Sequence, residues 1–517
     1  MAFQECKLTT LLLNEYFGPV IALVADELKW GRKPLKLLSL SVKLPLSTVK
    51  QALGIMIHFN FVDYKLSETN VCEYYLLPEN VLLILRYPKF ILLTRKRFGK
   101  EGEALIEELL RSGKMTSTNL ILKVTCTLAQ GNTKMSFSLR SIRTSTCELI
   151  ENGFIVPVEK VTRDVVPIKI KLSEHERVLP VELDKLTALY HGTDTEMPLN
   201  EFYWRVNFDR FLIEFRDELI VNAMSRRFDV HAGVVIRHVL KLAYQKSSTW
   251  WDNSDAISMM QIKESIGNNT NEAYALKYMD QYITVMKEDC SGIVGQPIDY
   301  TGGVVICIKE AIANLTSLYI SQIIDQKFGF KAARVFRLIQ DKKHCELEQI
   351  QQMAMLPDKE AKSIVYKLLE ENFIQIEELK KPSTTSSSGQ NKPFFLFCVD
   401  LNVIVKMVLS MCYKTIQNVI LRRKEEENKQ VHIIEKKKQS DLYVEALKEQ
   451  NASEEQIEEM VNQILTPPEK VILDNLQKVT KKLKLAELQT DETIFIFQMY
   501  VRFNKGHAPE SKLKKRS

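Results

Sequence analysis

The sequence has few of the features by which membrane or secreted proteins are recognised. Its nine cysteines are scattered singly, without a CxxC pair, which favours reduced core thiols over disulfides or zinc ligands. No uninterrupted apolar run of about 18 residues exists, so no membrane span or membrane partner is expected. The first residues, with acidic Glu5 and no small-residue cleavage site, do not resemble a signal peptide. We therefore expect a soluble protein of the cytosol or nucleus.

The usual catalytic motifs are also missing. There is no phosphate-cradling glycine loop, HExxH motif or nucleophile elbow. His231 and His238 share one predicted helix, and His344 adjoins Cys345, but neither pair has the further ligands that a structural zinc site requires. The sequence predicts no independent enzymatic activity, no cofactor and no metal site.

Length and composition are those of a folded protein with several domains. The 517 residues are 45% hydrophobic and 26% charged, which is ordinary for globular chains. The formal net charge is only +6, so the whole molecule is not a polycation. Any contact with nucleic acid is therefore expected to come from local basic patches.

One stretch near residue 358 predicts the architecture. Apolar residues recur at helical spacing between residues 358 and 370, after a short helix closed by Leu356-Pro357. Asn372 ends this pattern, and Ile374 and Ile376 then alternate with polar residues as in a half-buried strand. A long polar loop and a second apolar run follow. Helix, turn, helix, strand, loop and strand is the order of a winged helix.

The same pattern recurs along the chain. An amphipathic helix leads into Asn60 and, 92 residues later, into Asn152, and a degenerate copy spans residues 286–294. After residue 400, apolar residues instead alternate spacings of three and four, with Ile472, Leu476, Val479 and Leu483 in the longer run. The predicted fold is mainly α with small β-hairpins: four tandem winged-helix domains and a C-terminal antiparallel coiled-coil helical stalk.

The predicted domain boundaries follow from these patterns. They are residues 1–80 for winged helix 1, 86–172 for winged helix 2 (closed by a strand at 165–172), 173–225 for a linker and central aromatic helix, 226–310 for winged helix 3, 311–400 for winged helix 4, 401–505 for the stalk and 506–517 for a basic tail.

Two groups of basic residues are candidates for DNA contact, because clustered Lys and Arg provide the electrostatic footprint of nucleic-acid binding. One is the segment 86–100, which has six basic residues and no acidic one. The other is the third-helix region of modules one and two. The candidates are Lys43, Lys50, Arg95, Lys96, Arg97, Lys134, Arg140 and Arg143. The alternative for segment 86–100 is a solvated connector or a pairing with acidic partners. Asp358 and Glu360 would repel phosphates, so we expect them to face a protein partner.

An aromatic string, YWRVNFDRF at residues 203–211, is the most distinctive part of the sequence. Trp204, Phe208 and Phe211, together with Phe215, follow helical spacing, which favours a packed core over a base-stacking platform. We predict that these aromatics, with Leu476 and Leu483 of the stalk, form structural cores.

This string, together with the four predicted winged helices and the helical C-terminus, makes the chain resemble the third-largest subunit of RNA polymerase III. The resemblance implies a nuclear, non-catalytic subunit that acts in initiation, through promoter opening and docking of an initiation factor, at genes such as those for tRNA and 5S rRNA. The implied partners are two smaller specific subunits, the clamp of the largest subunit and DNA, contacted without sequence preference. Two alternatives remain open from the residues alone: a winged-helix scaffold of another assembly, and a free-standing DNA-binding regulator.

Overall fold

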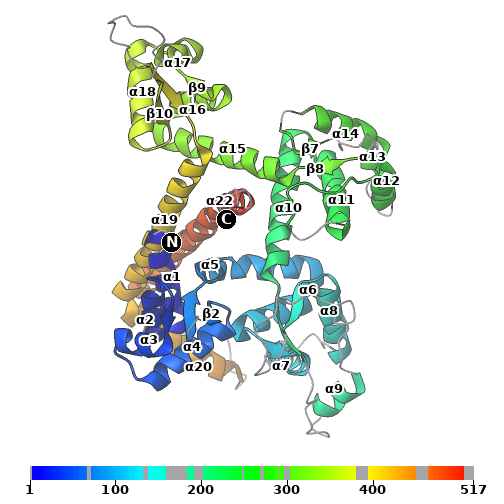
Figure 1. Ribbon diagram of the computed structural model, residues 1–517. Coiled ribbons are helices and arrows are strands. Elements are labelled where there is room, and N and C mark those ends of the chain that lie inside the picture. The colour runs from blue at the N-terminus through cyan, green and yellow to red at the C-terminus, as the bar shows by residue number, and fades with distance from the viewer. Residues whose placement is uncertain are drawn as a thin grey trace, which may run out of the picture. The chain divides into compact units, whose positions relative to one another are not determined.

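The computed structural model describes most of the chain, and the described part divides into two compact units (Figure 1). The first unit consists mainly of Thr9–Glu288 and Val294–Ile306, and the second mainly of Cys307–Ser517. The described residues are 3–66, 71–131, 138–158, 183–190, 202–246, 250–267, 273–289, 291–295, 303–379, 394–449 and 464–505. The predicted basic tail at 506–517 lies outside them.

The first winged helix follows α1 (Phe3–Phe17) and is built on a small antiparallel sheet in the order β1-β3-β2. Helix α4 packs Val49, Leu53 and Met56 into the core, and Leu38 of α3 is buried as well. Pro45 is the N-cap residue of α4 in an extended conformation, which separates the two short helices. The element bounds are α2 (Pro19–Leu28), β1 (Lys33–Pro34), α3 (Leu35–Val42), α4 (Leu46–His58), β2 (Val62–Leu66) and β3 (Cys72–Leu76).

The second winged helix takes its last strand from the aromatic string. Strand β6 lies between β4 and β5 and pairs antiparallel with both. The helical position predicted for Trp204 is therefore wrong: Trp204 lies in β6, and the helix begins at Phe208. The strand predicted at 165–172 lies outside the described residues. The bounds are α5 (Pro78–Leu82), η1 (Leu83–Arg86), α6 (Tyr87–Ser112), β4 (Met115–Thr116), α7 (Ser117–Gly131), α8 (Leu139–Glu151), β5 (Ile155–Val158), α9 (Leu183–Tyr190) and β6 (Tyr203–Val206).

The third winged helix has the smallest described sheet. Strands β7 and β8 pair antiparallel, and Ile257 adds an isolated bridge to Val304. The Ser254 hydroxyl accepts a hydrogen bond from the Ile306 backbone N–H, which ties the loop before α12 to β8. The bounds are α10 (Phe208–Arg227), α11 (Val230–Lys246), α12 (Met259–Gly267), α13 (Ala273–Lys277), α14 (Met279–Glu288), β7 (Val294–Gly295) and β8 (Val305–Ile306).

The fourth winged helix belongs to the second unit and has the sheet order β10-β11-β9. A reciprocal capping box between Glu346 and Gln349 starts α17, and Pro357 immediately precedes α18. The bounds are α15 (Ile308–Phe328), α16 (Phe330–Lys342), β9 (His344–Cys345), α17 (Leu347–Ala354), α18 (Asp358–Glu370), β10 (Gln375–Leu379) and β11 (Phe394–Cys398).

The recurring pattern in the sequence is a helix-ending turn. At the ends of α4, α8 and α18, Asn60, Gly153 and Asn372 have positive φ and donate their N–H to the carbonyl three residues earlier. The next N–H bonds to the carbonyl five residues earlier, which makes a Schellman motif. The residues after the turn are all buried: Phe61, Phe154 and Phe373. Asn60 thus corresponds to Gly153, one residue beyond Asn152, which keeps right-handed helical angles.

The C-terminal region is a helical hairpin. Its helices are α19 (Leu401–Lys429), α20 (Val431–Glu449) and α22 (Pro467–Lys505). Residues further along α19 and α20 meet progressively earlier residues of α22, so the packing is antiparallel. The polar contacts that show this are Tyr413 with Gln498, Arg423 with Glu487 and Lys436 with Glu469.

The predicted seam of α22 is out of register near its N-terminal end. Ile472 and Val479 are 38% and 41% exposed, whereas Leu473 is 7% exposed. Leu476 and Leu483 are half-buried. In the part of the chain that the structure describes, α19 is the one helix long and apolar enough to cross a membrane by length and composition. Its packing against α22 gives that apolar surface a role within the protein.

Candidate nucleic-acid interface

The first winged helix presents two of the candidate lysines to solvent. Lys43 caps the C-terminus of α3 in the left-handed conformation, at φ 57°, and its side chain is exposed. Lys50 is exposed on α4, while its neighbour Val49 is buried. Helical spacing alone places them so, because one face of α4 must pack into the core. In a winged helix this helix is the recognition helix, so Lys50 occupies a position suited to a phosphate.

Residues 86–100 form a helix rather than a connector. Arg86 is buried at the end of η1, and Arg95, Lys96 and Arg97 lie on α6. Gly99, with φ 72° and ψ −162°, interrupts α6 just beyond them, a conformation that glycine tolerates. The run of basic residues without acidic ones did not reveal that this segment is helical.

The three neighbouring basic residues on α6 have different surroundings. Arg97 donates to both carboxylate oxygens of Glu214, one of them at 3.0 Å. Arg210 also forms an ion pair with Glu214. Arg95 lies 3.5 Å from the carboxylate of Glu103, and Lys96 is exposed. Lys96 is therefore better placed than Arg97 to meet an external phosphate.

The recognition-position helix of the second module, α8, is fixed on one side and open on the other. Ser141 and Ser145 donate hydrogen bonds to the Glu101 carboxylate on α6, at 2.7 and 2.8 Å. Arg140 is exposed, whereas Arg143 is half-buried and engaged within the protein. Lys134 lies outside the described residues. Arg140 is thus the more accessible of the two candidate arginines.

The acidic start of α18 is partly neutralised by lysines. Asp358 pairs with Lys362 at 2.9 Å, and Glu360 pairs with Lys331 on α16. Carboxylates in the first turn of a helix are also favoured by its dipole. The structure therefore gives these two acids a local role in the fourth winged helix, and no partner is needed to explain them.

The aromatic cluster of the second module is a packing centre. Phe211 is fully buried and lies 4.8 Å from Phe90 and 4.9 Å from Phe154 between ring centroids. Phe208 is half-buried and stacks on Tyr87, whose pKa is raised by burial. Trp204 is buried in β6. The buried rings of Trp204 and Phe211 cannot stack on a nucleobase, and Phe208 already stacks on Tyr87, so these side chains serve packing and not nucleic-acid binding.

The histidines suggested by the sequence have other partners. The ring of His238 hydrogen-bonds the Ser265 hydroxyl at 2.8 Å, and His231 packs against a tyrosine ring. Cys345 is buried beneath the sheet of the fourth winged helix, away from the exposed side of His344. The ligand-type side chains beside His344 are instead Glu377 and Cys398, which no sequence spacing indicated.

Four family profiles match successive parts of the chain. Residues 7–67 match the RNA polymerase III subunit RPC82 helix-turn-helix domain, and residues 166–289 match RNA polymerase III subunit RPC82. Residues 320–399 match the POLR3C C-terminal winged-helix domain, and residues 432–496 match the helical hairpin domain of DNA-directed RNA polymerase III subunit RPC3. The fold and these matches define a mainly α protein of winged helices and a helical hairpin.

Curated relatives extend the similarity to nearly the whole chain. The DNA-directed RNA polymerase III subunit RPC3 of Rattus norvegicus is 31% identical, with 97% of this chain and 99% of that protein covered. Those of Homo sapiens and Danio rerio are 30% identical at the same coverage. The chain belongs to the RPC3 family of subunits of DNA-directed RNA polymerase III, whose members are accessory and not catalytic subunits. This membership favours neither the free-standing regulator nor the unrelated scaffold.

Proposed function

We propose that this chain acts in the nucleus as a subunit of RNA polymerase III during initiation at small non-coding RNA genes such as those for tRNA and 5S rRNA. In this proposal it assists promoter opening, contacts DNA near the cleft and docks an initiation factor. Its partners are two smaller specific subunits and the clamp of the largest subunit. The observation that carries the assignment is the alignment over 97% of the chain with proteins named as RPC3 subunits.

The assignment to initiation is tested with a polymerase that lacks this chain. We expect the depleted enzyme to extend RNA on a tailed template, because the catalytic residues belong to other subunits. Promoter-dependent transcription and promoter opening, read by permanganate reactivity of unpaired thymines, should fail and return when the purified chain is added back. Equal loss of both activities, or loss of neither, contradicts a role in initiation.

We propose that exposed basic residues of the first two modules contact DNA. Lys43, Lys50 and Arg140 are exposed basic side chains, which suits sequence-independent contact with phosphates. Replacing Lys50 and Arg140 with alanine should weaken DNA binding most at low salt. Each lost contact should reduce the slope of log affinity against log salt by about 0.9 on duplex or about 0.7 on single strands.

The size of this slope change also indicates which form of DNA is bound. Lys362→Ala on α18 serves as the matched control, because Lys362 lies on the corresponding helix of the fourth module and pairs with Asp358. Its slope should stay that of the wild type. An unchanged slope for the Lys50 and Arg140 double variant, with the protein folded and assembled, rejects these residues as DNA contacts.

A further inference from the structure

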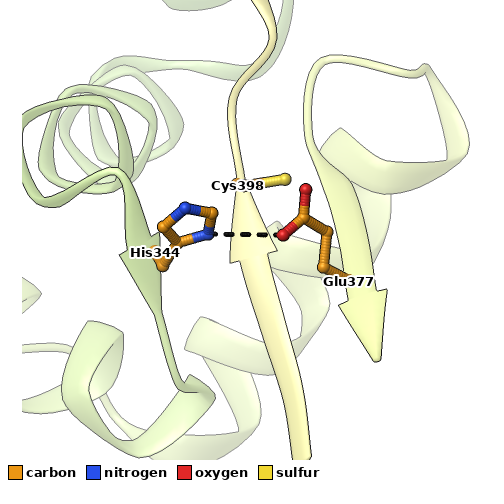
Figure 2. Close-up of side chains that lie close together, drawn as sticks. All are labelled: His344, Glu377 and Cys398. Carbon is orange, nitrogen blue, oxygen red and sulfur yellow. Dashed lines mark ion pairs between the residues drawn. The ribbon is translucent and has the colours of Figure 1, made fainter. Parts of the chain in front are cut away.

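Three side chains of metal-ligand type converge on one face of the fourth winged-helix sheet. The ligand atoms of His344, Glu377 and Cys398 all lie within 4.8 Å of one another, and the His344 Nδ1 to Glu377 Oε2 distance is 3.6 Å (Figure 2). Figure 2 shows the imidazole and the carboxylate on either side of the strand that carries Cys398. An ion pair joins the histidine and the glutamate, and the Cys398 thiol forms a hydrogen bond with the same Glu377 carboxylate.

The sheet register places the three residues on a common face. Cys398 ends the central strand β11 and lies directly opposite His344 in β9 and Gln375 in β10. Glu377 follows Gln375 by two residues, so strand alternation returns it to the same side. Cys345, next to His344, points to the other face and is buried. Three separate strands thus contribute one ligand each, and their positions are set by backbone pairing.

Access and donor chemistry suit a transition-metal ion. The side chains of His344 and Glu377 are 51% and 55% exposed, while Cys398 is 7% exposed at the base of the group. An ion can therefore enter from solvent and displace the proton of a thiol that the sheet shields. Thiolate with imidazole favours zinc-type ions over magnesium or calcium, which prefer oxygen ligands, and a carboxylate completes a common zinc donor set.

We infer that His344, Glu377 and Cys398 form a binding site for a zinc-type divalent ion on the exposed face of the fourth winged helix. Small side-chain rotations bring the three donors to bonding distance, and water fills the remaining position in the isolated chain. The bound ion cross-links β9, β10 and β11. One of its ligands, Cys398, lies two residues before Asp400, the N-cap of α19.

The test uses the purified full chain, stripped of metal under reducing conditions and titrated with cobalt as a spectroscopic probe. We expect a thiolate-to-cobalt charge-transfer band and visible bands of a low-symmetry four-coordinate ion, both abolished by added zinc. Cys398→Ser should abolish the charge-transfer band, and His344→Ala or Glu377→Gln should weaken cobalt binding at least about tenfold. Zinc should raise the melting temperature of the wild type but not that of these three variants.

Matched controls separate this site from other thiols and carboxylates. Glu378→Gln changes the neighbouring carboxylate on the opposite face of β10, and Cys72→Ser removes an exposed thiol of the first winged helix. Both should bind cobalt like the wild type, and circular dichroism without metal should show every variant folded. Absence of the charge-transfer band in the wild type, or its persistence in Cys398→Ser, overturns the inference.

Discussion

The Arg97 guanidinium and the Glu214 carboxylate, 117 residues apart in the sequence, form a two-point ion pair between α6 and α10. Arg210 shares the same carboxylate, and its own side chain is only 10% exposed. Two arginines therefore hold one glutamate, whose side chain is 12% exposed. The charge of Arg97 is thus paired within the protein, although its side chain is 45% exposed and the sequence around it is a run of basic residues.

Because Arg97 is paired with Glu214, substitutions of Lys96 and Arg97 are expected to have different effects. Lys96→Ala should leave stability unchanged and, if the α6 surface meets phosphates, flatten the salt dependence of DNA binding by about 0.9 on duplex. Arg97→Ala should instead lower the unfolding free energy by about 1 kcal/mol, because it removes a bidentate pair. Denaturant unfolding and a salt series of DNA affinities measure the two effects. A larger salt effect for Arg97→Ala than for Lys96→Ala would contradict the assignment.

The Schellman turn after α18 gives a second prediction. Asn372 has φ 59°, a conformation that costs an ordinary side chain roughly 1–2 kcal/mol and costs glycine almost nothing. Asn372→Ala should therefore destabilise the second unit by about 1 kcal/mol, and Asn372→Gly should not. Asn152→Ala is the control, because Asn152 has right-handed helical angles. Chemical denaturation of the full chain checks this, and equal effects of the two Asn372 variants would refute it.

The half-buried face of α22 gives a third prediction. Leu483 is partly covered in the hairpin, whereas Leu485, two residues along the same helix, is 55% exposed. Full burial of a leucine contributes about 1.5–3 kcal/mol, so Leu483→Asp should cost at least about 1 kcal/mol and Leu485→Asp much less. Melting followed by circular dichroism distinguishes the variants. If both left the melting temperature unchanged, Leu483 would not belong to the packed face.

The stability contributed by contacts at the start of α22 is predicted to depend on pH. The Glu469 carboxylate accepts hydrogen bonds from Lys436, from the Thr466 backbone N–H and from the Thr466 hydroxyl, and these lower its pKa to about 2. A carboxyl with a lowered pKa stabilises the fold above its ordinary value of 4.5, and this contribution is lost as pH falls toward 2.

The difference in melting temperature between wild type and Glu469→Gln should therefore be largest near neutral pH and decrease as the pH falls from 4.5 toward 2. Lys436→Ala should bring the pKa of Glu469 closer to its ordinary value, because it removes one of the three hydrogen-bond partners. The pH range over which the stability difference changes should therefore become narrower. Melting curves recorded across this pH range measure both effects. A difference that stays constant down to the acid end would show that Glu469 does not contribute through its charge.

The helices and their end turns were predictable because the signals are local. The apolar spacing between residues 358 and 370, with Pro357 before it and Asn372 after it, matches α18 at Asp358–Glu370. Recurrence of the same turn after α4 and α8 indicated repeated winged helices. A helix bonds residues four apart, so a window of about fifteen residues contains most of the information that defines it.

The sheets and the candidate sites were decided by tertiary structure. The string at residues 203–211 has helical spacing, but pairing with β4 and β5 makes its first part a strand. Likewise Arg97 meets Glu214, and His344 meets Cys398 instead of the adjacent Cys345. Such meetings depend on which distant strands pair and in which register, because backbone hydrogen bonds and core packing between remote segments decide them. No local pattern in the sequence determines that choice.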